Sequence, residues 1–432
     1  MNKNLKTSLE LGSMSNLQYG TVLICFLMNI LDGMDVMVIS YCAPAISKAW
    51  NIGPEALGIV FSSGLAGMAM GALFLAPFAD YMGRRKMILL SSILMGTSIF
   101  FTAWTDSISQ LIVLRFISGI GIGSMLASTA ALTTEFVPDR SRDFWVSFVI
   151  SGYPVGAVIS GVIAAYVVPI MGWEAMFKLA GLASFVTLPL ILWFLSESLD
   201  FYLKKQPVGA LEKINQILDK IGKEKIQILP EKEIKKSGIP IGKLLNADYR
   251  IATLQLWSAL FCAFGCLYFL ISWIPKLAET TGLSISLAIY AGTTFNVGAF
   301  LGIISQGYLS SLMGLKKTIF IFLVATAILM VSFQWVIGTD WILFLFGLLG
   351  FGIQGGFVGL YAVAARMYPS EFRTSGLGWA IGMGRFGGII GPAAGGVLIG
   401  MGFSIDTTFV IYAVPIFLAG IITYRISSKK VS

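Results

Sequence analysis

Apolar runs of roughly 20 residues or more constrain this chain more than any other feature of its sequence. A run of that length without a block of charges matches a helix that crosses the hydrocarbon core of a bilayer. The sequence therefore predicts an all-α membrane protein with twelve transmembrane helices. The twelve runs cover approximately residues 18–46, 56–79, 87–105, 108–133, 144–168, 175–196, 250–275, 284–309, 317–336, 341–365, 374–400 and 406–426.

The composition agrees with a membrane protein and excludes several kinds of chemistry. Only 12% of the 432 residues are charged, whereas soluble domains carry about twice that fraction. The chain has no histidine, so any proton that it handles must be carried by a carboxylate, a tyrosine or water. The four cysteines lie inside apolar runs without a metal-ligating spacing. Without a nucleophile elbow or phosphate loop, we expect no enzymatic activity, no cofactor and no metal.

Lysine and arginine are unevenly distributed between the two ends of the predicted helices. If the N-terminus is cytoplasmic, most of the 30 basic residues fall on the cytoplasmic side, as the positive-inside rule requires. We therefore predict a multi-pass protein of the inner (plasma) membrane with both termini in the cytoplasm. The net charge of +8 follows from this topology, so we expect the lipid bilayer and no nucleic acid as a partner.

The two halves of the chain repeat each other at a constant offset of 231 residues. The offset places Gly83 on Gly314, Gly119 on Gly350 and Gly156 on Gly387. We predict two parallel six-helix pseudo-repeats, an N-terminal bundle at 1–196 and a C-terminal bundle at 250–432, joined by a cytoplasmic linker at 197–249. Parallel repeats are typical of alternating-access transporters, in which the binding site lies near the midplane between the halves.

Four charged residues within the predicted helices break this repeat, because each aligns with an uncharged residue of the other half: Asp32, Asp35, Arg115 and Arg385. A charge at the centre of a bilayer costs about 2.5–3.5 kcal/mol on insertion scales, and these four sum to zero. Their depths along the helices favour two pairings, Asp32 with Arg385 through a substrate and Asp35 with Arg115. Static ion pairs that only fix helix packing are the alternative for each.

Asp32 and Asp35 lie three residues apart, on one face of the first predicted helix. Two carboxylates this close in a low dielectric cannot both ionise easily, so at least one is expected to bind and release a proton near neutral pH. We assign proton coupling to both acids, and substrate binding to Arg385 and Asp32. The small residues of GMGRFGG leave room for a ligand beside the Arg385 guanidinium.

Two segments carry a resemblance to a known family. APFADYMGRRK at 76–86 and RFISGIGIG at 115–123 resemble signatures of the major facilitator superfamily. Within it, LDGMD at 31–35 and YPSEFRTSGLGWAIGMGRFGGIIGP at 368–392 resemble the aromatic acid:proton symporter family. The likeness implies a major facilitator fold and proton-coupled import of a small aromatic carboxylate, such as a hydroxybenzoate or benzoate, by alternating access.

The resemblance also implies a latch in the cytoplasmic loop that follows the second helix. Arg84 and Arg85 are expected to pair with nearby acids and Asp80 to accept hydrogen bonds from a helix N-terminus, although a simple positive-inside anchor is the alternative for the arginines. Glu135 aligns with Arg366 in the repeat, which suggests salt bridges that rearrange during switching. The predicted gating residues are Asp80, Gly83, Arg84, Arg85, Arg115, Glu135 and Arg366.

Aromatic and amide side chains on the second-half helices are candidates for binding the organic anion, although such residues also occur at lipid interfaces. The candidates are Tyr268, Trp273, Asn296, Gln354, Tyr361 and Trp379. We expect the protein to function as a monomer. A ring-cleaved dicarboxylate such as muconate, proton-driven efflux of such acids, and a membrane sensor that does not transport all remain open at this point.

Overall fold

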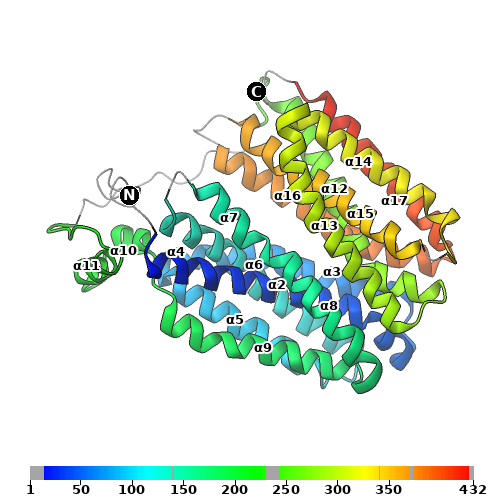
Figure 1. Ribbon diagram of the computed structural model, residues 1–432, viewed down its shortest axis with the longest axis horizontal. Coiled ribbons are helices and arrows are strands. Elements are labelled where there is room, and N and C mark those ends of the chain that lie inside the picture. Colours follow the sequence, from blue (N-terminus) through cyan, green and yellow to red (C-terminus); the bar gives the residue numbers. More distant parts are fainter. Residues whose placement is uncertain (1–13, 139–140, 230–243, 340, 369–372, 428–432) are drawn as a thin grey trace. The chain divides into compact units, whose positions relative to one another are not determined.

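The computed structural model of the protein describes residues 14–138, 141–229, 244–339, 341–368 and 373–427. The first half of the chain forms long helices at each predicted run (Figure 1). They are α2 (Asn16–Trp50), α3 (Pro54–Met70), α5 (Arg84–Thr102), α6 (Ile108–Phe136), α7 (Arg142–Ile150) with α8 (Gly152–Met171), and α9 (Trp173–Phe194). The second half adds α12 (Arg250–Thr280), α13 (Ile285–Met313), α14 (Leu315–Ser332), α15 (Ile342–Met367), α16 (Arg373–Gly400) and α17 (Ile405–Arg425).

All twelve predicted runs are helical, which confirms the all-α class. Within the described ranges, 11 helices are long and apolar enough to cross a membrane. The twelfth is α16, which has 28 residues but is less apolar because it contains Arg385 and many glycines. Helices α2 and α12 run further than predicted and continue past Pro44 and Pro275, as membrane helices often do.

Helix α3 ends in an irregular turn that the sequence did not reveal. Residues Gly71–Leu75 form a π-helical turn, Ala76–Phe78 form a 3-10 turn, and the short helix α4 (Ala79–Met82) follows. A Cβ atom added at Gly71 would overlap the backbone carbonyl of Ile120 in α6. The change in helix type therefore occurs where α3 lies directly against α6, next to the loop signature.

The predicted linker is partly helical. Helix α10 (Leu199–Lys205) begins at Ser198, whose hydroxyl accepts a hydrogen bond from the Phe201 amide at 3.0 Å, which is an N-cap. Helix α11 (Ala210–Lys220) follows. Residues 230–243 of the linker lie outside the described residues.

Contacts divide the chain into two compact units. Unit 1 consists of Met1–Asp35, Ala66–Gly156 and Phe177–Lys236, and unit 2 consists of Val36–Leu65, Ala157–Met176 and Ser237–Ser432. Four helices, α2, α3, α8 and α9, therefore contribute residues to both units. The domain boundaries drawn from the repeat, at 196 and 250, stay a prediction.

Within unit 1, glycines allow the backbones of two helices to come into direct contact around the LDGMD segment. A Cβ atom at Gly33 would overlap the carbonyl oxygen of Tyr153, and one at Gly156 would overlap the carbonyl oxygen of Ile30. Contacts through small residues of this kind are the usual way in which membrane helices associate closely. The first turns of α8 thus lie against the part of α2 that carries the two acids.

Within unit 2, α12 packs along α16, α13 along α15, and α14 against α15 and α17 (Figure 1). An aromatic core joins α12 to α17, because Phe269 and Tyr412 stack with ring centroids 3.8 Å apart. The Tyr412 hydroxyl donates to the Gly391 carbonyl of α16 at 2.5 Å. Helices α12 and α17 are therefore fixed against α16, which carries Arg385.

Candidate functional site

A buried ion pair in unit 1 joins Asp35 of α2 to Arg115 of α6. Nη1 of Arg115 lies 2.6 Å from Oδ1 of Asp35, and Nη2 donates to the Asp35 backbone carbonyl at 3.2 Å. The Ser118 hydroxyl, one turn further along α6, donates to the other carboxylate oxygen. The side chains of Asp35 and Arg115 are 0% and 3% exposed. The structure confirms the pairing that was predicted from the depths of the two residues.

Asp32 lies one turn before Asp35 on α2 and is also buried. Arg115 and Ser118 both bind the carboxylate of Asp35. Asp32 belongs to unit 1, whereas Arg385 belongs to unit 2. The pairing of Asp32 with Arg385 through a substrate, and the role of both acids in proton coupling, stay predictions.

In unit 2, Arg385 of α16 lies beside an aromatic cluster formed by Phe264 and Tyr268 of α12 and by Phe357 and Tyr361 of α15. The Arg385 guanidinium interacts electrostatically with Tyr361. The Phe264 ring centroid lies 5.9 Å from that of Tyr268 and 4.7 Å from that of Phe357. The Phe357 and Tyr361 centroids are 5.2 Å apart. Two predicted ligand residues, Tyr268 and Tyr361, are thus gathered next to the predicted arginine.

The surroundings of Arg385 correct one detail of the sequence interpretation. A Cβ atom at Gly384 would overlap the ring of Phe264, and one at Gly388 would come within 2.9 Å of the Tyr268 ring. The aromatic cluster, not a ligand, therefore fills the space over these two glycines. The open side is at Gly378 and Gly382, where an added Cβ atom would meet no atom of a described residue within 4 Å.

Arg385 itself is half-buried and forms no ion pair with any acid among the residues that the structure describes. A guanidinium has five donors in a rigid fork that matches a carboxylate. The aromatic cluster supplies flat apolar faces and, at Tyr361, a hydroxyl. This arrangement is suited to binding a planar organic anion.

The other predicted ligand residues lie elsewhere in unit 2 and have different surroundings. Trp273 is buried and its indole N–H donates to the Pro392 carbonyl at 3.0 Å, so that donor is already used within the fold. Trp379 is exposed. The amide nitrogen of Asn296 donates to its own helix at Gly292, 2.9 Å away. The binding roles of Trp273, Asn296 and Trp379 stay predictions.

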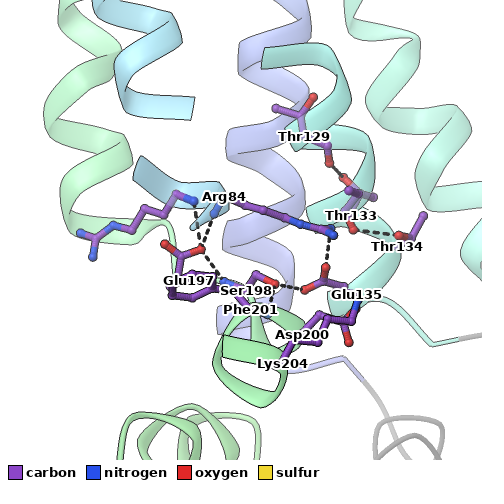
Figure 2. Close-up of polar contacts among 12 residues, drawn as sticks. Arg84, Thr129, Thr133, Thr134, Glu135, Glu197, Ser198, Asp200, Phe201 and Lys204 are labelled. Atoms are coloured by element: carbon purple, nitrogen blue, oxygen red, sulfur yellow. Dashed lines mark hydrogen bonds and ion pairs between the residues drawn. The ribbon is translucent and has the colours of Figure 1, made fainter. Parts of the chain in front are cut away.

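A second polar site in unit 1 connects the loop signature to the start of the predicted linker, as Figure 2 shows. Arg84 forms an ion pair with Glu135 of α6, and the Ser198 hydroxyl donates to the other Glu135 oxygen at 2.5 Å. Oε1 of Glu197 accepts the backbone N–H groups of Arg84 and Arg85 at 2.7 and 3.1 Å. A carboxylate at the N-terminus of α5 satisfies amides that have no partner in the helix.

Gly83 has a structural reason to be glycine in this second site. Its φ of +99° lies in the region that side chains rarely adopt, and a Cβ atom there would overlap the Glu197 carboxylate. The Arg85 guanidinium donates to the Leu192 carbonyl of α9. These contacts confirm that Arg84 pairs with a nearby acid, whereas Arg85 binds a carbonyl instead.

Helix α10 adds two further contacts to the same site. The Lys205 ammonium lies 4.0 Å from the ring centroid of Tyr81, a cation–π geometry. Burial, which would raise the pKa of the Asp200 carboxyl, is outweighed by the hydrogen bond and charge of Lys204, so that pKa lies below its usual value. Helix α10 is thus held to the loop signature by charged groups as well as by its cap.

Two predicted gating residues form no ion pair with any residue that the structure describes. Asp80 is exposed on α4, and its predicted contact with the N-terminus of α16 involves the other unit and stays a prediction. Arg366 is exposed at the end of α15 and forms no ion pair with a described residue. Residues 369–372 of the stretch that resembled the symporter family lie outside the described residues.

Comparison with known proteins identifies the family. The Major Facilitator Superfamily model matches residues 25–306 and 256–431, which together span nearly all of the chain. The chain belongs to the Major Facilitator Superfamily. It is therefore a multi-pass membrane transporter and not an enzyme.

Relatives within the superfamily are aromatic acid transporters. The chain is 31% identical to a 4-hydroxybenzoate transporter of Acinetobacter baylyi, over 94% of this chain and 91% of the relative. It is 29% identical to a gallate transporter of Pseudomonas putida, over 94% of this chain and 90% of the relative. The fold is similar to the crystal structure of a D-xylose-proton symporter, with a TM-score of 0.75 and 17% identity over 95% of this chain and 98% of that one.

Several residues of this superfamily member were not found by sequence reasoning. Ser118 completes the binding of Asp35, and Glu197 and Ser198 hold the loop signature. Phe264 and Phe357 complete the aromatic cluster. The sequence SESLD at 196–200 did carry a signal for Ser198, because a serine followed by an acid within the next turn is typical of a helix start.

Proposed function

We propose that the protein is a proton-coupled symporter of the inner membrane that imports a small aromatic carboxylate, such as a hydroxybenzoate or benzoate, by alternating access. The observation that carries this proposal is the position of Arg385 beside the aromatic cluster of unit 2. The guanidinium would bind the carboxylate in a bidentate manner, and the rings would contact the aromatic ring of the substrate. The names of the relatives support the same class of substrate.

The proposed proton carrier is the acid pair of α2. Without histidine in the chain, a carboxylate is the side chain best suited to exchange protons near neutral pH. Asp35 would have to release Arg115 and Ser118 to take up a proton, and we propose that Asp32 and Asp35 exchange it as a coupled pair. The site formed by Arg84, Glu135 and Glu197 would bias the conformational equilibrium, because it ties the loop to α6 and α10 within unit 1.

Transport by purified protein in liposomes tests the proposal. Counterflow should occur with hydroxybenzoates or benzoate and not with muconate, and an inward proton gradient should drive accumulation that a protonophore abolishes. Counterflow with muconate alone would contradict the aromatic substrate. Aromatic counterflow without gradient-driven accumulation would contradict proton coupling.

The role of Arg385 has a sharper test. Arg385→Lys keeps the charge but removes the planar fork, and loss of a charge-assisted hydrogen bond costs about 1.5–3 kcal/mol, roughly ten- to over a hundredfold in affinity. Calorimetry on detergent-purified protein measures this change, with a size-exclusion profile as the folding control. An affinity within threefold of wild type would indicate that Arg385 supports the fold and does not bind the substrate.

A further inference from the structure

Gln354 of α15 is a buried amide whose hydrogen bonds are not made within the described chain. Its side chain is 8% exposed and forms no hydrogen bond with any described residue. The amide atoms of Gln354 are not among the fully buried side-chain atoms that lack a partner. They therefore lie at a surface that water or a ligand can reach, and a ligand there could supply the hydrogen bond that the described chain does not.

The position of Gln354 on its helix connects it to the proposed binding site. Residues 354, 357 and 361 have the spacing i, i+3, i+7, so they share one stripe of α15. Phe357 and Tyr361 on this stripe belong to the aromatic cluster, and Tyr361 interacts with Arg385. From one end to the other, the stripe offers an amide, a ring, and a hydroxyl beside a guanidinium.

Neighbouring helices cover one end of this stripe and the opposite side of α15. A Cβ atom at Gly350 would overlap the Phe295 carbonyl of α13, and one at Gly359 would overlap the side chain of Ile319 in α14. Gly350 lies four residues before Gln354 and therefore on the same side, so α13 covers the stripe at that end, whereas Gly359 lies on the opposite side of α15. The stripe's members Phe357 and Tyr361 are only half-buried, so a ligand could reach the helix along this part of the stripe.

Geometry points to Gln354 as the residue that selects a polar substituent on the substrate ring, opposite the carboxylate. Seven residues of helix span about 10.5 Å, which is close to the length of a para-substituted benzoate with one hydrogen bond at each end. A benzoate whose carboxylate is bound by Arg385 would therefore place its para substituent at the level of Gln354. This inference rests on the proposed function and narrows the substrate class to para-hydroxylated aromatic acids.

The chemistry of the amide favours a hydroxyl over the alternatives. An amide both donates and accepts hydrogen bonds, and so does a phenolic hydroxyl, so each can satisfy the other. Unsubstituted benzoate would leave the amide unpaired, which is the situation in which a polar site rejects an analogue most strongly. A second carboxylate at this position would meet a neutral amide rather than a base.

Ligand affinity of purified full-length protein tests the inference, with 4-hydroxybenzoate and benzoate as probes. Wild type should bind 4-hydroxybenzoate about five- to 150-fold more tightly than benzoate, which corresponds to about 1–3 kcal/mol. Gln354→Leu should abolish this preference by weakening 4-hydroxybenzoate and leaving benzoate within about threefold. A 3-hydroxybenzoate probe should show a smaller preference, because its hydroxyl does not lie opposite the carboxylate.

Gln306 of α13 provides the matched control. It is a similarly buried amide, but its nitrogen lies near Gly359, on the side of α15 away from the stripe. Gln306→Leu should therefore keep the wild-type preference. An unchanged preference in Gln354→Leu, or an equal loss of both ligands, would overturn the inference. Failure of wild type to bind either acid would instead contradict the proposed function.

Discussion

Replacing Arg115 with methionine should destabilise the protein by leaving the Asp35 carboxylate buried, with Ser118 as its remaining donor among the described residues. Removing one partner of a buried ion pair costs about 3–5 kcal/mol, because the other charge is left uncompensated. Nη1 of Arg115 lies 2.6 Å from Oδ1 of Asp35, and both side chains are at most 3% exposed. Arg115 also donates to the Asp35 backbone carbonyl. We therefore expect a loss of about 4 kcal/mol.

The double variant Asp35→Leu/Arg115→Met tests whether the loss of stability comes from the unpaired buried charge or from the changes in packing. Apolar replacement of both members of a buried pair is often neutral or stabilising, and the freed Ser118 hydroxyl can bond to a carbonyl of its own helix. The double variant should therefore be more stable than either single variant, with a coupling energy of at least about 3 kcal/mol in the double-mutant cycle.

Unfolding by titration with sodium dodecyl sulfate, on protein with a monodisperse size-exclusion profile, gives the free energies for this cycle. Additive losses, in which the double variant is as unstable as the two single variants together, would refute the reasoning. Because Asp35 is also assigned to proton coupling, the double variant should fold but lose proton-driven accumulation. Wild-type accumulation by this variant would show that the ion pair of Asp35 and Arg115 only fixes helix packing and takes no part in proton coupling.

Three further predictions concern α2 and the loop signature. Asp32→Asn should abolish proton-driven accumulation in liposomes and keep counterflow, because an amide cannot exchange a proton; wild-type accumulation would exclude Asp32 as the carrier. Arg84→Ala should slow turnover several-fold without changing ligand affinity, because the ion pair with Glu135 acts on the conformational equilibrium; a collapse of calorimetric affinity would contradict this role. Gly33→Ala should lower the yield of monodisperse protein, since its Cβ atom would overlap a carbonyl of α8, whereas Gly20→Ala, with nothing within 4 Å, should behave as wild type.

The fold could be predicted from the sequence because the bilayer imposes one length and one polarity on every crossing helix. Counting residues from helix ends also gave depth, since each residue adds about 1.5 Å, and this is why the pairing of Asp35 with Arg115 could be foreseen. The same method could not supply Ser118. A serine in a membrane helix usually bonds to its own backbone, so its type and position carried no signal.

The aromatic cluster shows a different limit of sequence reasoning. Phenylalanine is equally common on lipid-facing surfaces of membrane helices, and Phe344 and Phe386 are such exposed residues here. Only packing distinguishes them from Phe264 and Phe357. The spacing of Gln354 and Tyr361 along one helix face was, in contrast, visible in the sequence. Gly384 and Gly388, beside Arg385, were misread for the same reason, because small residues make room for a neighbouring ring as readily as for a ligand.

The composition of α16 also has a consequence for biosynthesis. Its arginine makes insertion into the membrane during translation less favourable than for a wholly apolar helix, by about 2.5–3.5 kcal/mol if it passes through the bilayer centre. Helix α12 is synthesised more than a hundred residues earlier, and its Phe261 and Gly265 carbonyls lie where Cβ atoms at Gly387 and Gly391 would stand. When α16 leaves the ribosome, a partner with a matching backbone surface is thus already in the membrane. We therefore expect α16 to be inserted against α12, so that the arginine proposed to bind the substrate also makes its helix rely on packing against an earlier one.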